Sequence, residues 1–140
     1  MLVLPSSGPA EEAEVNQTLK VTSKQLKRAA HNSLWRLKKA VEKDGFYSAR
    51  VALNVWRSCA IDAGLFDQSQ YNEFKQQIYE KSVISNLNCF EISLLNENYT
   101  DAQICLHTWK IHSEVLGTFD QAFYDEMKSR LETTTNTKKE

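Results

Sequence analysis

Residues 56–78 read WRSCAIDAGLFDQSQYNEFKQQI, and residues 109–131 repeat this pattern 53 positions later as WKIHSEVLGTFDQAFYDEMKSRL. The two copies align without a gap. Both contain a Trp, a Gly eight residues after it, and a Phe-Asp-Gln triplet followed by a Tyr. A repeat of this length is typical of stacked helical units. It predicts two helical pairs, in each of which a tight turn joins one helix to the next.

The residue types shared by the two copies all have a role in packing a pair of helices. Gly64 and Gly117 can adopt the left-handed conformation that the tight turn requires. Asp67 follows the first glycine as an N-cap, because its carboxylate accepts hydrogen bonds from the free N–H groups of the next helix. The Trp of each copy lies mid-helix, where a large side chain packs against the second helix. The repeat therefore predicts the fold, and the function has to be sought elsewhere.

Composition and length fit one soluble domain. The chain has 140 residues, of which 41% are hydrophobic and 25% charged, and this is ordinary for a globular protein. Both prolines lie in the first ten residues, so proline does not interrupt a helix anywhere beyond them. We expect a disordered lead-in at 1–20, a single all-helical domain at 21–132 and a disordered tail at 133–140. The proline-containing lead-in suggests a piece of a longer protein.

The apolar spacing predicts an all-α fold of five or six helices in antiparallel pairs, arranged as an α-superhelix or bundle. Capping boxes at Thr22, Asp67 and Thr100 are expected to begin three of the helices, and Gly45 to end the first. The segment 82–97 fits a short helix, although part of it alternates like a strand. The helices are expected at residues 22–43, 46–63, 68–81 and 101–116, with a last one after Asp120.

Charge is concentrated in one segment. The net charge is −1, but Lys20–Lys43 holds eight basic residues and one acid, so that segment carries +7 and the remainder −8. Such asymmetry indicates a localised electrostatic surface. On the first predicted helix, the face away from the apolar stripe carries the candidate binding residues Lys24, Arg28, His31, Trp35, Lys38 and Lys39.

A Trp surrounded by cations is typical of a contact site for phosphate, an acidic peptide or a stacked base. The alternative is that another element covers Trp35 and that the lysines form an ordinary solvated face. The sequence leaves both interpretations open.

Motifs for catalysis and metal binding are missing from the sequence. It contains no GxSxG, Walker, GxGxxG or HExxH pattern, and its carboxylates are scattered. Cys105, His107 and His112 hint at a metal site, but positions 105 and 107 point about 200° apart on a helix, which argues against zinc. We therefore expect no enzyme activity, no catalytic residues, no metal and no cofactor.

Localisation follows from the cysteines and from hydropathy. Cys59, Cys89 and Cys105 are odd in number and widely spaced, and this pattern predicts buried, reduced thiols. No apolar run approaches the length needed to cross a membrane. We expect a nuclear or cytoplasmic protein without a membrane contact.

Part of the sequence resembles a known family. The matching residues are Phe46, Trp56-Arg57, Ala60-Ile61, Tyr71-Asn72-Glu73-Phe74, Glu80-Lys81 and Leu87-Asn88-Cys89-Phe90-Glu91-Ile92. On these residues the chain resembles, over about 50 positions, the C-terminal helical domain of the large Ku subunit, which is associated with the DNA-dependent protein kinase. The resemblance implies a helical superhelix that docks protein partners in non-homologous end joining. The helical pair from Thr100 to Leu131 and the end Thr-Lys-Lys-Glu depart from that family, and no functional residue is carried over.

A second similarity lies in Asn98-Tyr99-Thr100-Asp101-Ala102, Leu106-His107, Lys128 and Arg130. These residues are similar to the helical bundle shared by the steroid receptor RNA activator protein and the C-terminal region of the Sec31 coat subunit. Three functions follow as expectations. The first is a non-catalytic adaptor domain that binds an acidic protein surface or peptide, of Ku type and serving DNA double-strand-break repair. The others are a nucleic-acid-binding domain that uses the basic first helix and a scaffold or coat-type bundle.

Overall fold

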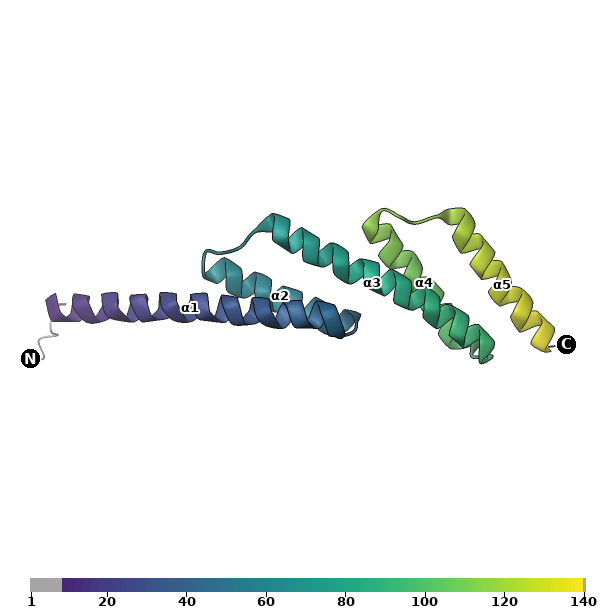
Figure 1. Ribbon diagram of the computed structural model, residues 1–140, viewed down its shortest axis with the longest axis horizontal. Helices are drawn as coiled ribbons and strands as arrows, with labels where there is room; N and C mark the ends of the chain where they lie inside the picture. The colour runs from purple at the N-terminus through teal and green to yellow at the C-terminus, as the bar shows by residue number, and fades with distance from the viewer. Residues whose placement is uncertain (1–8, 140) are drawn as a thin grey trace, which may run out of the picture.

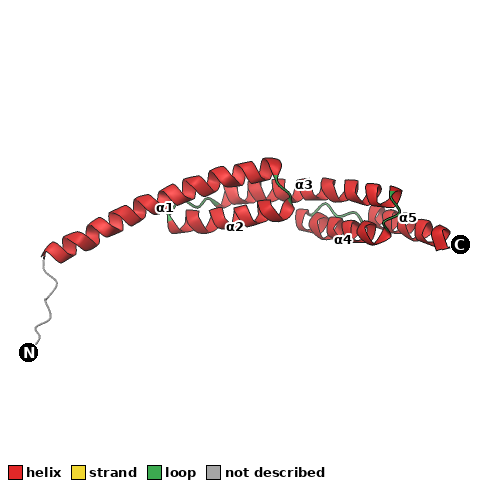
Figure 2. Ribbon diagram, turned by 90° about the horizontal axis from the view of Figure 1, so that it is seen from below, coloured by secondary structure: helices red, strands yellow, loops and turns green. Residues whose placement is uncertain are grey.

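The computed structural model describes the backbone of residues 9–139 and the side chains of residues 22–137. Five helices follow one another: α1 (Pro9–Lys43), α2 (Phe46–Asp62), α3 (Gln68–Leu95), α4 (Tyr99–Leu116) and α5 (Gln121–Lys139). Residues 9–139 contain no strand, so the predicted all-α class is confirmed. Consecutive helices run in opposite directions and form an elongated array (Figure 1, Figure 2).

Two hydrophobic cores lie one after the other along this array. The first is built by α1, α2 and the first half of α3, and its buried residues are Leu37, Ala40, Val41, Ala49, Leu53, Trp56, Ala60 and Ile78. The second is built by the second half of α3, α4 and α5, and its buried residues are Phe90, Ala102, Cys105, Leu106, Trp109 and Met127. Because α3 contributes to both cores, the molecule consists of two three-helix units that share this helix.

The structural repeat is one helix longer than the sequence repeat. Trp56 and Trp109 each pack against the Phe of the following turn, with ring centroids 5.9 Å and 5.8 Å apart. The same offset of 53 residues relates Leu37 of α1 to Phe90 of α3, and both side chains are fully buried. The second half of α3 is therefore the counterpart of the second half of α1.

The prediction of a separate element at residues 82–97 is wrong, because α3 continues without a break from Gln68 to Leu95. The two halves of α3 bury opposite sides of the helix. At 100° per residue, Phe74 of the first core and Val83 of the second lie half a turn apart. An apolar stripe that changes side resembles the end of one helix and the start of another, which explains the error.

Two predicted helix starts are also corrected. α1 begins at Pro9, so Thr22 lies within the helix and is not its N-cap. Proline fits the first position of a helix, because the N–H there needs no helical partner. The N-cap of α4 is Asn98 and not Thr100, since the Asn98 side chain accepts a hydrogen bond from the backbone N–H of Asp101 at 3.2 Å.

The turns of the repeat are formed as predicted. Gly64 and Gly117 have φ angles of 70° and 73°, the left-handed region that favours glycine. Asp67 and Asp120 accept hydrogen bonds from backbone N–H groups in the first turn of the next helix, at 2.9 Å and 3.1 Å. Gly45 differs from its predicted role, because its extended backbone makes it the N-cap of α2.

Helix extends into both ends that the sequence predicts to be disordered. α1 includes residues 9–20, whereas residues 1–8 of the expected lead-in lie outside the described part of the chain. α5 continues through the expected tail to Lys139. There the Thr134 and Thr137 hydroxyls donate to carbonyl oxygens four residues earlier, at 2.8 Å and 2.9 Å. These bonds satisfy the hydroxyls within the helix.

The prediction that all cysteines are reduced is wrong for two of the three. Cys89 of α3 and Cys105 of α4 form a disulfide, with their Cα atoms 6.1 Å apart, and Cys59 is free. The two partners are 16 residues apart in the sequence, and the antiparallel packing of α3 on α4 brings them together. The reduced-thiol argument for a nuclear or cytoplasmic location therefore no longer applies.

Candidate interaction surface on α1

Contacts on one side of α1 hold the candidate surface in place. Ala30, Leu37 and Ala40 are buried on that side, and α1 packs on α2 there. At the C-terminal end of α1, the Lys81 ammonium of α3 donates a hydrogen bond of 2.9 Å to the Glu42 carbonyl oxygen. A cation at free carbonyl groups stabilises the end of a helix. The outer face of α1 thus belongs to a helix whose opposite side is packed against the rest of the molecule.

The six candidate residues lie together on this outer face. All of them are exposed, and at 100° per residue they fall within about 60° of Trp35. We call this set the α1 face: Lys24, Arg28, His31, Trp35, Lys38 and Lys39. Trp35 is 62% exposed, so the alternative in which another element covers it does not hold among the described residues.

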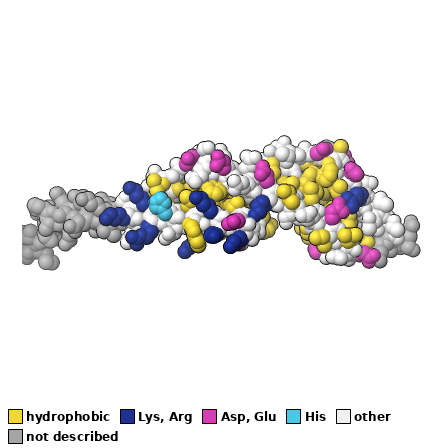
Figure 3. All heavy atoms as spheres, viewed as in Figure 1, with side chains coloured by type: hydrophobic (Ala, Val, Ile, Leu, Met, Phe, Trp, Pro, Cys, Tyr) yellow, Lys and Arg dark blue, Asp and Glu magenta, His cyan; other side chains and the backbone are white. Residues whose placement is uncertain are grey.

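Positive charge on the α1 face is not neutralised by neighbouring carboxylates. Among the side chains of residues 22–137, none of its Lys or Arg residues forms an ion pair. The Lys39 ammonium instead lies 5.6 Å from the centroid of the Trp35 ring. Figure 3 shows the Lys and Arg side chains gathered over α1 with few carboxylates among them. The face can therefore attract anions and offer an apolar ring beside them.

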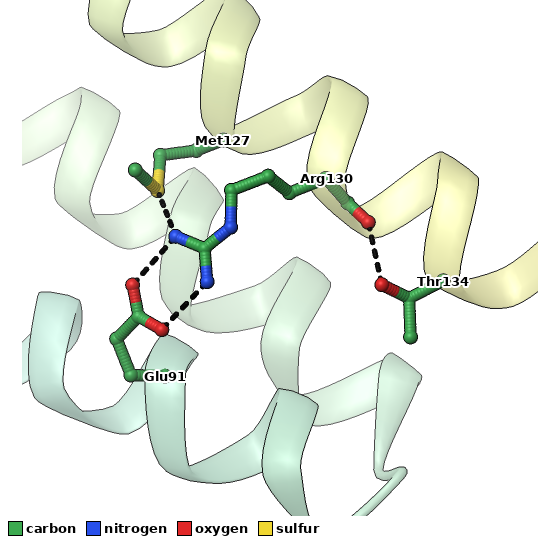
Figure 4. A network of polar contacts seen from close by, with 4 residues as sticks. All are labelled: Glu91, Met127, Arg130 and Thr134. Atoms are coloured by element: carbon green, nitrogen blue, oxygen red, sulfur yellow. Dashed lines mark hydrogen bonds and ion pairs between the residues drawn. The ribbon is translucent and has the colours of Figure 1, made fainter.

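An ion pair does form at the other end of the molecule. Arg130 of α5 donates two hydrogen bonds, both of 2.7 Å, to the Glu91 carboxylate of α3 (Figure 4). The hydrogen bond from Arg130 lowers the pKa of Glu91 and raises the pKa of Arg130. The sequence does not reveal this pair, because its members lie on different helices 39 residues apart.

A buried polar cluster lies where the two units meet. The Ser82 hydroxyl of α3 is 2.6 Å from Nδ1 of His112 of α4. The His112 ring also packs on Phe46 and Tyr79, with centroid distances of 4.2 Å and 5.0 Å. Burial lowers the pKa of His112, and the nearby charge of Arg50 lowers it further. Ser82 and His112 are both buried, so this pair contributes to the packing where the two units meet.

The residues considered for a metal site are not brought together. Cys105 is part of the disulfide, His107 is exposed and His112 is buried at the junction. In the described part of the chain, no group of three or more His, Cys, Asp or Glu side chains is placed to hold a metal ion. None of the described helices is long and apolar enough to cross a bilayer.

Comparisons with known proteins identify no relative of this chain. No protein-family model, no curated protein and no solved structure matches the chain. The resemblances to the Ku domain and to the Sec31-type bundle therefore stay predictions.

Proposed function

We propose that this chain is a non-catalytic protein-interaction module, and that its α1 face binds an acidic surface or peptide of a partner protein. The observation that carries the proposal is the exposed Trp35, which lies among unpaired cations on a packed helix. Tryptophan and arginine are enriched among the residues that dominate a binding interface. The cations add attraction for a partner of opposite charge.

The shape of the face favours a peptide or a protein surface of modest size. From Lys24 to Lys39 the face follows a single helix for about 22 Å, at 1.5 Å per residue. A partner segment of similar length could contact the whole face with alternating acidic and apolar side chains. A Ku-type role in double-strand-break repair would be one case of this function, and it rests on the sequence resemblance alone.

Nucleic-acid binding is the second candidate, because an exposed Trp between cations also suits a stacked base. Salt dependence separates the two candidates. Binding to a phosphate backbone releases counterions, so the affinity falls steeply as salt increases. A scaffold or coat-type role remains a third expectation, with the sequence similarity as its support.

Peptide selection tests the proposal directly. A phage-displayed library of random 12-residue peptides is selected on the wild-type protein and on the triple variant Lys24→Glu, Arg28→Glu, Lys39→Glu. We expect peptides rich in Asp and Glu with at least one large apolar residue. Synthetic copies should bind the wild type, and their affinity should fall about tenfold or more in the triple variant and in Trp35→Ala.

The matched control changes the same charge on the same helix. Lys27→Glu, Arg36→Glu, Lys43→Glu reverses three exposed cations that lie about 80–100° from Trp35, and it should retain most of the affinity. Equal loss in both triple variants would mean that only net charge matters, and would contradict a defined face. Failure to enrich any peptide, together with salt-sensitive binding of single-stranded or duplex DNA, would replace the proposal with the second candidate.

A further inference from the structure

A groove runs along the molecule between α1 and α3. It has a volume of about 510 Å³ and is lined by Lys38, Val41 and Glu42 of α1 and by Phe74, Gln77 and Ile84 of α3, among others. Its apolar lining is accessible, because Ile84 is 62% exposed. Lys38 belongs to both this groove and the α1 face, so the two surfaces are continuous.

The second three-helix unit contains the same groove between α3 and α5. That groove has a volume of about 550 Å³. The offset of 53 residues relates the two linings, because Lys38 corresponds to Glu91, Gln77 to Arg130, and Val41 to Leu94. The two grooves therefore occupy equivalent places in the two units, and their linings differ in the residues at equivalent positions.

In the second unit a charged pair of the protein itself bridges α3 and α5 in the lining of the groove. The Arg130 guanidinium bridges to Glu91 through two hydrogen bonds of 2.7 Å, and it donates to Met127 Sδ at 3.3 Å (Figure 4). It also lies 5.7 Å from the centroid of the Phe90 ring. The charge of Arg130 in this lining is thus matched by a carboxylate of the same chain.

In the first unit no such pair forms between the described residues that line the groove. Gln77 is neutral and shorter than arginine, and Lys38 provides a cation at the position of Glu91. Lys38 and Gln77 are both exposed, and no described side chain forms an ion pair with Lys38. The groove therefore combines the apolar side chains of Val41, Phe74 and Ile84 with an ammonium and an amide, both of which are hydrogen-bond donors.

We propose that the α1–α3 groove seats an acidic and apolar segment of the partner protein. A carboxylate of that segment accepts hydrogen bonds from Lys38 Nζ and Gln77 Nε2, and a neighbouring apolar side chain covers Ile84. The partner thereby supplies a carboxylate for Lys38, as Glu91 does for Arg130 in the second unit. This inference rests on the proposed function, because it places the same acidic partner on a surface continuous with the α1 face.

The charges of the groove also set the direction of the segment. Glu42 and Glu80 line the same groove, and Lys81 is engaged with the backbone at the C-terminal end of α1. Acidic side chains of the partner are therefore disfavoured near Glu42 and favoured from Lys38 toward the start of α1. The apolar anchor lies over Ile84, and the acidic part continues onto the α1 face.

The test transplants the charged pair of the second unit into the first. The double variant Lys38→Glu, Gln77→Arg installs the pairing of Glu91 with Arg130, so that position 38 no longer offers an ammonium to the partner's carboxylate. Ile84→Ser removes the apolar anchor from an exposed position, so the variant should fold. Lys27→Gln changes the net charge by the same amount as the double variant and serves as the control.

Binding is measured with the synthetic peptides selected on the wild-type protein. We expect the affinity to fall about tenfold in the double variant and about fivefold in Ile84→Ser, as for anchors at the centre of an interface. Lys27→Gln should stay within about twofold of the wild type. The methyl resonance of Ile84 should shift when peptide is added, and circular dichroism should show each variant folded.

The possible outcomes separate this inference from the proposed function. If peptides lose affinity for the triple reversal of the α1 face but bind the double variant and Ile84→Ser normally, the function stands and the groove is not part of the site. If no library peptide binds the wild-type protein, the proposed function fails and the groove inference fails with it.

Discussion

Trp56 and Trp109 occupy the same place in two successive three-helix units, 53 residues apart, and each is at least 95% buried. Each ring packs on a Phe in the following turn and on a second Phe in the next helix, with the second centroids 5.8 Å and 5.1 Å away. The two units share α3, so they are joined by continuous helix and not by a linker. Loss of packing in one unit should therefore lower the stability of both units.

Trp56→Ala and Trp109→Ala should each lower the free energy of unfolding by about 3–5 kcal/mol, the usual cost of removing a large buried aromatic side chain. Urea denaturation followed by circular dichroism should show a single transition for both variants, because α3 belongs to both cores. Trp35→Ala, at an exposed position, should change the stability by less than about 0.5 kcal/mol. Two separated transitions in either core variant would show that the units unfold independently.

The sequence predicts the second and third helices of each unit because their turn is chemically distinctive. Gly64 and Gly117 need a positive φ and the following Asp residues cap a helix, so the same residue types recur in both copies. The first helix of each unit has only apolar spacing in common, as Leu37 and Phe90 illustrate. That part of the repeat becomes visible only when the buried positions are known.

The candidate binding residues also divide into those that the sequence predicts and those that only the structure reveals. The α1 face could be predicted because its residues recur within one helix, where spacing alone places them on one side. Gln77 and Ile84 could not be predicted as partners of Lys38, because they lie on another helix and neither residue type signals a site. The disulfide was missed for a related reason, since its cysteines meet only through the packing of α3 on α4.

The pair of Arg130 and Glu91 should contribute modestly to stability and only when Glu91 is ionised. Its side chains are 41% and 49% exposed, so Arg130→Gln should cost no more than about 1 kcal/mol at pH 7. The hydrogen bond from Arg130 lowers the pKa of Glu91 below 4.5. The stabilisation is therefore fully present above pH 4.5 and is lost as the pH falls through the lowered pKa of the folded state.

Thermal unfolding of the wild type and Arg130→Gln between pH 7 and pH 2.5 checks this prediction. The difference in free energy should shrink toward acid and also in 1 M salt, which screens exposed charges. Lys128→Gln, an exposed change of the same charge on α5, is the control. A difference that stays constant down to pH 2.5 would show that Arg130 acts through packing on Phe90 and Met127 alone.

Reduction of the disulfide between Cys89 and Cys105 should destabilise the second unit. The bridge closes a loop between residues 16 apart, and a loop of this length is worth about 3 kcal/mol of unfolding free energy. The melting temperature should fall when a thiol reductant is added. Without reductant, thiol titration of the denatured protein should give one free thiol, and after reduction it should give all 3 cysteines.

A cysteine variant separates the disulfide from other effects of the reductant. Cys59→Ser should show no free thiol before reduction and the same fall in melting temperature after it. In the double variant Cys89→Ala, Cys105→Ala, the reductant should leave the melting temperature unchanged. Titration of three free thiols in the denatured wild type without reductant would refute the bridge.

His112 should make the protein less stable in mild acid. Burial, helped by the charge of Arg50, lowers the pKa of His112 in the folded state below its ordinary value of 6.5. Above pH 6.5 both states hold the neutral ring. As the pH falls from 6.5 to the lowered pKa, the unfolded state binds a proton that the folded state does not, so the free energy of unfolding decreases.

Replacement of His112 by Asn should remove this dependence at the cost of the contact with Ser82. The free energy of unfolding, measured in urea between pH 7.5 and pH 5, should fall for the wild type and stay flatter for His112→Asn. The same replacement at the exposed His107 controls for the loss of an imidazole elsewhere on α4. We expect the pH dependence of the free energy of unfolding to come from His112. Its ring is packed between Phe46 and Tyr79, and its Nδ1 is already hydrogen-bonded with the Ser82 hydroxyl. If the free energy of unfolding of His112→Asn falls with pH as steeply as that of the wild type, a group other than His112 binds the proton.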